Sequence, residues 1–477
     1  MLFIIPLMQK HRKLILLMLL ACAAADAFAA IVTVQGRKLF VDSRQFSVKG
    51  VCFSPIPAGY NWQYVWADVP SIYSSDLPLV KSMGATTVRT YQERQITQGF
   101  LDAAAANGLY VIVGWGEELW SKDFSNPATR AVYVNKFGDF VDKWKAHPAV
   151  LMWCFGNEVE RHTDSPSGWF QLVQEAAAKA HSLDSNHPVG TDCGENTVIG
   201  VSALGTTDAA LADLDIWLPN IYRGKSFGEF FTEMSTRTAK AYIVGEWGCD
   251  SYNGVKLLED QSAQDEYIRF QWAEIAAKAA ECAGGCVFEW SDEWWKGATT
   301  PGDASTLGQG GVNGTNSHDT AADWTNTAFD NDPNMNEEWW GLVTVAQGVL
   351  RSPRLAYYSL RELWSTAAAT VSNASSGIIQ GSIKSYPNPF IAGRDTARIE
   401  FTVTGEPAVE IAIFGLAGDK VFQLENIVDL GSGVRAADWT GKNDDGNFVP
   451  AGLYICRVKA KAGGREEVKY RKIAVVK

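Results

Sequence analysis

The segment Val150-Leu-Met-Trp-Cys-Phe-Gly-Asn-Glu158 decides the fold. It begins as an uninterrupted apolar run, which is typical of a strand buried on both faces, as strands are in parallel sheets. The segment Ala241-Tyr-Ile-Val-Gly-Glu-Trp-Gly248 has the same form. Each segment therefore predicts a buried strand that carries a glutamate, Glu158 or Glu246, at its carboxyl end.

Eight buried strands are predicted in all, and amphipathic helices alternate with them. The expected strands are residues 50–55, 86–92, 110–116, 150–158, 188–193, 216–222, 241–248 and 284–290. Apolar positions at helical spacing predict helices at 75–83, 98–107, 129–146, 169–183, 263–281 and 354–364. Strand–helix units repeated over about 330 residues predict an α/β fold, a (β/α)8 TIM barrel, whose active site lies at the carboxyl ends of the strands.

The rest of the chain follows a different pattern. Short alternating strands are expected in residues 31–50, before the barrel. Residues 297–340 form an irregular segment rich in Gly, Asn, Asp and Trp, and loops of that length are usually functional or disordered. We assign residues 30–366 to the barrel domain, the small and polar residues 367–382 to a linker, and residues 383–477 to a small all-β sandwich.

The amino terminus has the features of an export signal. Lys10, Arg12 and Lys13 precede an apolar run, residues 14–25, and small residues follow at 27–29. We place a signal peptide at residues 1–29, the alternative being a membrane anchor, for which the run is shorter than the roughly 20 residues of a span. Residues 19–22 also resemble a lipoprotein signal, in which Cys22 would be acylated. The protein is therefore expected to be secreted, periplasmic or attached to the cell surface.

Cysteines give little sign of a disulfide framework or a metal site. The chain has 8 Cys, and removal of residues 1–29 leaves an odd number, so at least one thiol should stay free. Cys282 and Cys286 are a candidate pair, but no second cluster gives them metal-ligand spacing.

Composition narrows the class of ligand. The formal net charge is -12, so the neutralisation of phosphates that dominates nucleic-acid affinity has no general support, and DNA and RNA are poor partners. The 477 residues include 18 Trp, 15 Tyr and 22 Phe. Amphipathic aromatic rings are common where a ligand is gripped on a face, so a neutral, stackable ligand such as a sugar is favoured.

Glu158 and Glu246 are the candidate catalytic residues. A carboxylate that ends an apolar strand is costly unless it lies at the mouth of the barrel, and there the two would converge on one cavity. Hydrolysis of an acetal needs such a pair, because one carboxyl group protonates the leaving oxygen while the other attacks the anomeric carbon. The alternative is that each is a solvated glutamate at a strand end.

These motifs resemble those of the clan A retaining glycoside hydrolases, over roughly residues 46–364. Residues 145–158 are similar to the corresponding stretch of β-galactosidases and β-glucuronidases, whose amino-terminal sandwich domains are absent here. Val88-Arg-Thr-Tyr91, Gly156-Asn-Glu-Val159, Asn220-Ile-Tyr222 and Gly245-Glu-Trp-Gly-Cys249 are similar to motifs of the β-1,3-glucanosyltransferases, although those have Tyr at the position of Trp247.

The resemblance implies a role for each strand-end residue. Glu158 would be the acid/base and Glu246 the nucleophile, with Asn157 bonded to the sugar 2-hydroxyl group. Arg89 would keep Glu246 ionised, unless it pairs with Glu93 instead. Two further residues, Tyr222 and Trp290, would donate to Glu246 and stack on a pyranose, respectively; core packing is the alternative for both.

Weaker candidates lie in the loops that follow strands three, four and eight. Trp115, Glu117, Glu118 and Trp120 would line neighbouring subsites or be ordinary loop residues. Trp294, Trp295, Trp339 and Trp340 are candidates for a stacking platform, and His162 for a substrate contact.

The carboxyl-terminal residues resemble the immunoglobulin-like domains that end many secreted bacterial proteins, related to the sandwich of the flagellar hook-capping protein. The similar stretches are residues 385–390, 439–447, 450–454 and 471–477. The resemblance implies sorting or attachment through the cell surface or secretion machinery.

The sequence thus predicts an exported retaining β-glycosidase that acts without a cofactor on a β-linked glycan, of endo-β-glucanase or mannanase type. Two alternatives stay open: a transglycosylase similar to the β-1,3-glucanosyltransferases, and a non-catalytic carbohydrate-binding protein.

Overall fold

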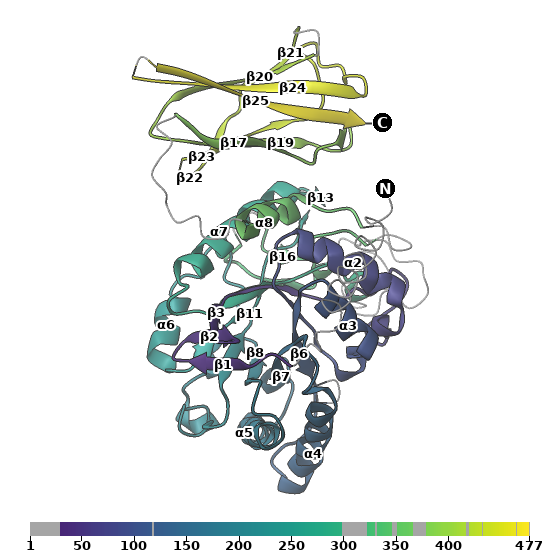
Figure 1. Cartoon of the computed structure of the whole chain (residues 1–477), viewed down its shortest axis with the longest axis vertical. Coiled ribbons are helices and arrows are strands. Elements are labelled where there is room, and N and C mark those ends of the chain that lie inside the picture. The colour runs from purple at the N-terminus through teal and green to yellow at the C-terminus, as the bar shows by residue number, and fades with distance from the viewer. Residues whose placement is uncertain are drawn as a thin grey trace, which may run out of the picture. The chain divides into compact units, whose positions relative to one another are not determined.

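A computed structural model describes residues 29–116, 119–297, 322–329, 332–345, 351–365, 378–415, 419–431, 433–463 and 465–476. The chain divides into two compact units, residues 1–356 and 357–477. Figure 1 shows the barrel and the sandwich that the sequence predicts.

Eight parallel strands form the barrel. In order around it they are β4 (Val48–Cys52), β5 (Thr87–Arg89), β6 (Tyr110–Trp115), β7 (Val150–Phe155), β8 (Val189–Cys193), β9 (Ile216–Pro219), the pair β10 (Ala241–Tyr242) and β11 (Val244–Trp247), and β14 (Gly284–Val287). The seventh strand is in two pieces: β10 pairs with β9, whereas β11 pairs with β14, which in turn pairs with β4. The circle is therefore closed, and the predicted TIM barrel is confirmed.

Helices surround the barrel at the expected places. They are α2 (Pro70–Ser82), α3 (Gln98–Ala106), α4 (Pro127–Trp144), α5 (Pro166–Leu183), α6 (Phe230–Arg237) and α7 (Gln261–Ala277). The expected helix α8 (Leu355–Ser365) begins at the end of the first unit and continues into the second. Helices α2, α4 and α5 begin at a proline, whose fixed φ suits the first helical position. Helix α6 was not predicted, since it has only 8 residues and buries only Phe230, Phe231 and Met234.

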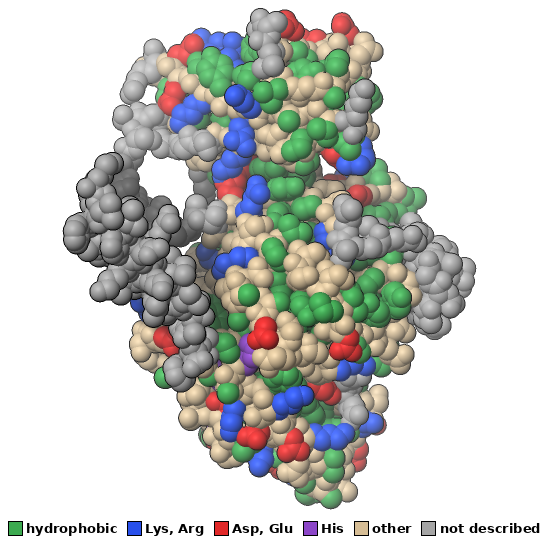
Figure 2. Space-filling view, turned by 45° about the vertical axis from the view of Figure 1, so that its right-hand side comes forward, with side chains coloured by type: hydrophobic (Ala, Val, Ile, Leu, Met, Phe, Trp, Pro, Cys, Tyr) green, Lys and Arg blue, Asp and Glu red, His purple; other side chains and the backbone are tan. Residues whose placement is uncertain are grey.

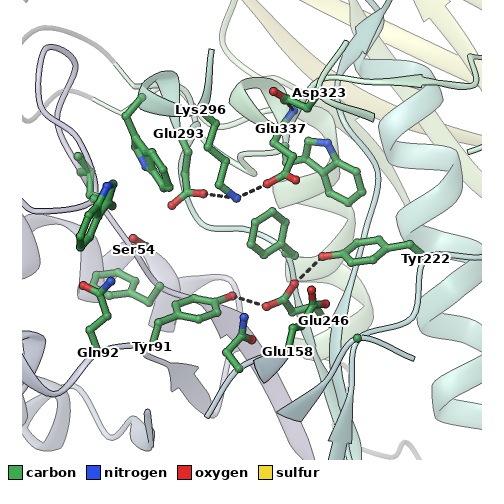
Figure 3. A pocket seen from close by; sticks show the side chains of 18 of the residues that line it. Ser54, Tyr91, Gln92, Glu158, Tyr222, Glu246, Glu293, Lys296, Asp323 and Glu337 are labelled. Atoms are coloured by element: carbon green, nitrogen blue, oxygen red, sulfur yellow. Dashed lines mark hydrogen bonds and ion pairs between the residues drawn. The ribbon is translucent and has the colours of Figure 1, made fainter. Parts of the chain in front are cut away.

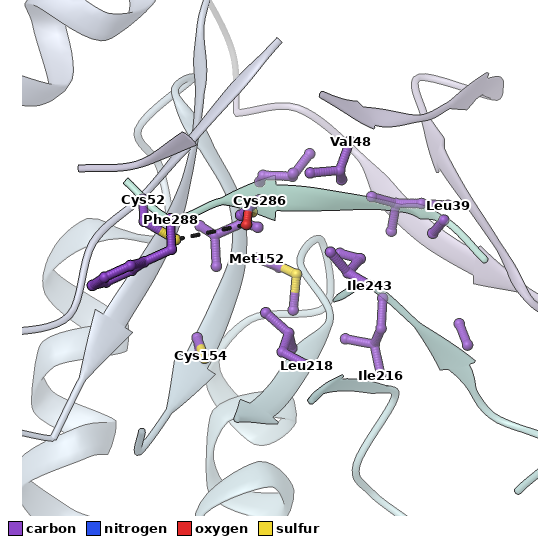
Figure 4. Packing of buried hydrophobic residues seen from close by; sticks show 14 of the residues in the cluster. Leu39, Val48, Cys52, Met152, Cys154, Ile216, Leu218, Ile243, Cys286 and Phe288 are labelled. Atoms are coloured by element: carbon purple, nitrogen blue, oxygen red, sulfur yellow. Dashed lines mark hydrogen bonds between the residues drawn. The ribbon is translucent and has the colours of Figure 1, made fainter. Parts of the chain in front are cut away.

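Apolar side chains pack together inside the barrel (Figure 4). Met152, Ile216 and Ile243 from three strands belong to one buried cluster. Leu39, from the sheet of β1 (Val32–Gln35), β2 (Lys38–Val41) and β3 (Arg44–Phe46), joins the same cluster. Because the Val32 amide donates to the carbonyl of Asn186, just before β8, this sheet lies at the amino ends of the strands. The carboxyl ends of the strands lie at the opposite end of the barrel, where this sheet does not cover them.

The second unit contains a sandwich of two mainly antiparallel sheets. One sheet has the order β17 (Ile379–Tyr386), β19 (Ala397–Val403), β23 (Val434–Trp439) and β22 (Val428–Gly431). The other has the order β18 (Phe390–Ile391), β25 (Arg465–Val476), β24 (Gly452–Ala462), β20 (Ala408–Phe414) and β21 (Lys420–Leu424). Its core contains Phe390, Ile399, Trp439 and Cys456, so the all-β prediction is confirmed.

The seven cysteines of the described residues are all buried and free, including Cys282 and Cys286, so the candidate pair is not formed. None of the described helices is long and apolar enough to cross a membrane. On the face shown in Figure 2, acidic and basic side chains lie among one another.

Candidate active site

A cavity of about 1080 Å³ lies at the carboxyl ends of the barrel strands, and both candidate glutamates line it (Figure 3). Its aromatic lining residues are Phe53, Trp62, Trp66, Tyr91, Trp120, Tyr222, Phe288, Trp295, Trp324 and Trp340. Aromatic walls with a few convergent polar groups are typical of a ligand site.

Glu246, on β11, accepts hydrogen bonds from three side chains. Nη1 of Arg89 and the hydroxyl group of Tyr91 each lie 2.9 Å from its Oε1. The hydroxyl group of Tyr222 lies 2.8 Å from its Oε2. Since both oxygens accept, this arrangement suits the ionised carboxylate, and it fixes the direction in which the group points.

Glu158 has fewer partners. It follows β7 by three residues and adopts a left-handed backbone conformation, φ 50°, after Gly156, φ 83°. The side-chain amide of Asn220 donates to its Oε1 at 2.8 Å. Burial raises the pKa of Glu158, and the nearby charge of Glu246 raises it further. Glu158 is therefore suited to carry a proton.

Arg89, at the end of β5, connects the two sides of the site. Its guanidinium group is buried and forms ion pairs with Glu246 at 2.9 Å and with Asp192 at 2.8 Å. Its Nη2 also donates to Oδ1 of Asn157 at 2.6 Å. The alternative pairing is not seen, because Glu93 accepts from the Gly116 amide at 3.1 Å.

A glycine before the nucleophile candidate makes room for this network. A Cβ atom on Gly245 would lie 2.4 Å from the Leu218 carbonyl oxygen, 2.6 Å from Oδ2 of Asp192 and 2.9 Å from Oδ1 of Asn220. These are shorter than real Cβ contacts. Gly245 therefore lets Arg89 reach its carbonyl oxygen, 2.9 Å from Nη1, without displacing either neighbour.

Two expected substrate contacts lie outside the cavity. Trp115 is only 4% exposed and stacks on Phe155 at 5.2 Å, because its position on β6 directs it toward the helices. Trp290 is 0% exposed and lies behind Phe53, which is itself a lining residue. The prediction for Trp290 assumed that strand eight continues to that residue, but β14 ends at Val287 and Phe288 lines the cavity.

Some of the weaker candidates line the cavity and others do not, and Trp120 is one that does. Its indole nitrogen donates to the Asn157 carbonyl oxygen at 3.0 Å, and its ring stacks on His162 at 3.8 Å. Trp295 and Trp340 also line the cavity. Trp294, Trp339 and His162 are not lining residues. Glu117 and Glu118 lie outside the described residues.

Several residues of the site were missed or given no role by the sequence analysis. Asp192, Asn220 and Tyr91 end or follow strands five, six and two, so their positions at strand ends were a usable signal. Glu293, Lys296 and Glu337 also line the cavity, but they come from irregular segments that have no periodicity. In the described part of the chain, no group of three or more His, Cys, Asp or Glu side chains is arranged to hold a metal ion.

The known proteins that resemble this chain in sequence include glucanosyltransferases. A family profile described as "Glucanosyltransferase" matches residues 21–198, a segment that includes Glu158 and ends before Glu246. The 1,3-beta-glucanosyltransferase GAS2 of Saccharomyces cerevisiae is 26% identical over 177 residues, 33% of this chain and 32% of that protein. The 1,3-beta-glucanosyltransferase gas2 of Schizosaccharomyces pombe is 19% identical over 302 residues, 58% of this chain and 64% of that protein.

A solved structure shares the fold. The beta-glucuronidase of Bacteroides uniformis superposes with a TM-score of 0.56 and 13% identity, over 94% of this chain and 48% of that one. The two chains therefore share a fold, at low sequence identity. This chain spans only about a third of the Saccharomyces relative and about half of the glucuronidase. The chain thus resembles parts of two glucanosyltransferases in sequence and part of a beta-glucuronidase in fold.

Proposed function

We propose that the protein is a retaining β-glycosidase that cleaves a β-linked polysaccharide or oligosaccharide by double displacement. The observation that supports this most is the contrast between two carboxyl groups in one cavity. Glu246 accepts from three donors, whereas Glu158 accepts from Asn220 and has a raised pKa. A nucleophile and a proton donor require these two environments.

In the first step, Glu246 attacks the anomeric carbon and the bond to the leaving oxygen breaks. Glu158 gives its proton to that oxygen, so a glycosyl ester and a free hydroxyl group result. In the second step, Glu158 takes a proton from water, whose oxygen displaces Glu246. In this proposal Arg89, Tyr91 and Tyr222 hold the nucleophile, and Asn157, whose Oδ1 accepts from Arg89, bonds the sugar 2-hydroxyl group.

The cavity suits a substrate of more than one sugar. Its volume is above the range of about 300–1,000 Å³ for sites of drug-sized ligands. Trp62 and Trp120 line it and are partly exposed, at 39% and 48%. Such rings offer stacking faces for further sugars, so endo-acting cleavage of a β-glucan or β-mannan is our first candidate.

Incubation with a panel of soluble β-glucans and β-mannans tests the proposal. New reducing ends should form, and they should be absent with Glu246→Gln. Glu175→Gln, which removes a glutamate paired with Arg130 away from the cavity, should cleave normally. Binding without any new reducing end, by a folded protein, would instead identify a carbohydrate-binding protein.

Transfer to a second sugar is a second candidate, because the family profile and both fungal relatives are glucanosyltransferases. The acceptor hydroxyl group would replace water in the second step. With laminarin-type oligosaccharides at high concentration, products longer than the substrate should appear early. A mixture of shorter products alone would leave hydrolysis as the activity.

We also propose that the protein is exported, on the basis of the basic, apolar and small residues in positions 10–29. Its mature amino terminus should lie near residue 30, or at Cys22 with an attached lipid. Amino-terminal sequencing of the fractionated protein tests this, and an intact Met1 in the cytoplasm would contradict it. Sorting or surface attachment is our proposal for the carboxyl-terminal sandwich.

A further inference from the structure

Two glutamates hold a lysine on the wall of the cavity. Nζ of Lys296 lies 2.8 Å from Oε2 of Glu293 and also pairs with Glu337. We call these three residues the Glu293–Lys296–Glu337 clamp. In Figure 3 the clamp lies apart from Glu158 and Glu246. All three clamp residues line the same cavity as the two catalytic candidates.

The charge of Lys296 is already matched within the protein. Burial alone would lower the pKa of Lys296, but Glu293 and Glu337 raise it well above its ordinary value. The lysine therefore stays protonated between two carboxyl groups. It also lies over the Phe288 ring, with Nζ 4.8 Å from the centroid, which limits its freedom to turn toward a ligand.

Acidic groups outnumber basic ones in the lining. The acidic residues are Glu158, Glu195, Glu246, Glu293, Asp323 and Glu337, and the basic residues are Arg161 and Lys296. Glu195 is matched by Arg223, and Arg161 is engaged with the Gly194 carbonyl oxygen. Glu158 carries a proton before the reaction, and burial raises the pKa of Asp323 to about 7, so the excess of negative charge is smaller than the count of residues. A sugar that brings its own carboxylate would still meet the carboxylates of Glu246, Glu293 and Glu337.

We propose that the Glu293–Lys296–Glu337 clamp restricts the cavity to neutral sugars, with Glu293 and Glu337 accepting hydrogen bonds from sugar hydroxyl groups. A uronic acid would have to draw Lys296 away from a glutamate and leave that glutamate unpaired. This substrate class separates the chain from the β-glucuronidase whose fold it shares. The inference rests on the proposed glycosidase function.

Covalent labelling of Glu246 measures the preference directly. The neutral probe is cyclophellitol aziridine and the acidic probe is its 6-carboxylate, and intact mass spectrometry follows both. The neutral probe should label the unaltered protein about 100-fold faster or more, since like charges brought together in a buried site are strongly disfavoured. Equal rates, or faster labelling by the acidic probe, would overturn the proposal.

Variants of the clamp test its part in this preference. Glu337→Gln leaves Lys296 with one carboxylate partner, so the ratio of neutral to acidic labelling rates should fall by about tenfold. Glu293→Gln is the second variant, in case the first does not fold. The control Glu175→Gln removes the same charge from the Arg130 pair between α4 and α5 and should leave the ratio unchanged. An unchanged ratio in both folded clamp variants would show that the clamp does not set the preference.

A failure of the glycosidase proposal gives a different result. In that case neither probe would label Glu246 in a protein that melts cooperatively. Calorimetric titration with laminaribiose and with a glucuronic-acid disaccharide would then test the selectivity of the clamp independently of catalysis. Tighter binding of the acidic disaccharide would refute it.

Discussion

Glu246 accepts from three donors that end or follow two strands, β5 and β9, whereas Glu158 accepts from the amide of Asn220. The two side chains are chemically the same, so their different roles must come from these surroundings. A nucleophile has to keep its charge and its direction. An acid/base has to change its protonation state twice in each cycle.

This difference predicts how each loss can be rescued by azide. With Glu158→Ala and an aryl glycoside whose leaving group needs little protonation, the glycosyl ester should still form. The loss of proton transfer should slow turnover by about 10²–10⁴-fold. Azide needs no general base, so it should restore turnover and give a β-glycosyl azide. With Glu246→Ala, azide should occupy the space of the carboxylate and give the α-azide. Product configuration is measured by NMR, and exchanged configurations would reverse the two roles.

The same surroundings predict a change in the pKa of Glu158 during the cycle. Burial raises this pKa first, and the charge of Glu246 second. When Glu246 is esterified it loses its charge, so the pKa of Glu158 should fall and the residue should become a better base. Glu246→Gln mimics this loss. Carboxyl ¹³C NMR should show a lower pKa for Glu158 in that variant and an unchanged pKa in Glu175→Gln; an unchanged pKa in both would contradict the coupling.

Sequence reasoning placed some residues of the site and misplaced others for a geometric reason. Arg89, Asn157 and Tyr222 end or follow barrel strands. Arg89 and Tyr222 donate to Glu246, and Arg89 also donates to Asn157. Trp115 also ends a strand, but alternate residues of a strand face opposite sides. Its side chain meets Phe155 and the helices instead. Prediction of the site therefore needs both the position of a residue at a strand end and the side of the strand to which its side chain points.

At the scale of elements, the seventh strand is the most constrained. It breaks between β10 and β11, and the break lets Glu246 form a bridge with Asn220, beyond the end of β9. Gly245 lies next to this bridge with no space for a side chain. The main chain here is therefore as important for the site as the side chains are.

Gly245→Ala should reduce both stability and activity. The new methyl group would contact the Leu218 carbonyl oxygen and Asp192, so β11 must shift and move Glu246. A displacement of about 1 Å in a catalytic group can cost about 100-fold in rate, and we expect a loss of that size together with a lower Tm. Gly452→Ala, where a Cβ atom would have space, is the control. Wild-type kinetics in the folded Gly245→Ala protein would contradict this account.

The barrel elements were predictable because buried parallel strands are continuous apolar runs. The break in strand seven was not, since Ile243 is as apolar as its neighbours and continues the run. In the segments after β14, Trp295 and Trp340 were candidates and line the cavity, but Lys296 and Glu337 were missed. Irregular segments carry no periodicity, so their side chains can be placed only by tertiary structure.

For the whole molecule, each unit has its own apolar core. The barrel cluster includes Met152 and Ile216, and the sandwich cluster includes Ile399 and Trp439. The sequence predicted both architectures from their different periods, alternating in the sandwich and continuous in the barrel. It gave no chemistry for the sandwich, and the matched family profile, residues 21–198, ends before it.

The barrel also buries a carboxyl group that the proposed mechanism does not use. Glu289 is 0% exposed, and neither of its carboxyl oxygens has a hydrogen-bond partner in the described part of the chain. Burial raises the pKa of Glu289 well above its ordinary value; Glu293, Glu337 and Asp292 raise it further, and Lys296 opposes them. The folded protein therefore holds this proton more tightly than the unfolded chain does.

Replacing this residue should make the protein less sensitive to alkaline pH. In the unfolded chain, a glutamate ionises at about pH 4.3. Above that pH the unfolded state loses the proton and the folded state keeps it, so the contribution of Glu289 to stability falls until the pH reaches its folded pKa. Glu289→Gln has the same shape and no such loss. Its Tm relative to the unaltered protein should rise as the pH increases above 5, by about 2 °C for each pH unit in a barrel of this size, until the folded pKa of Glu289 is reached. Glu229→Gln, at an exposed position before α6 where the side chain makes no capping bond, is the control and should show no such slope. A difference in Tm that stays constant or falls with pH would mean that Glu289 is ionised in the folded barrel.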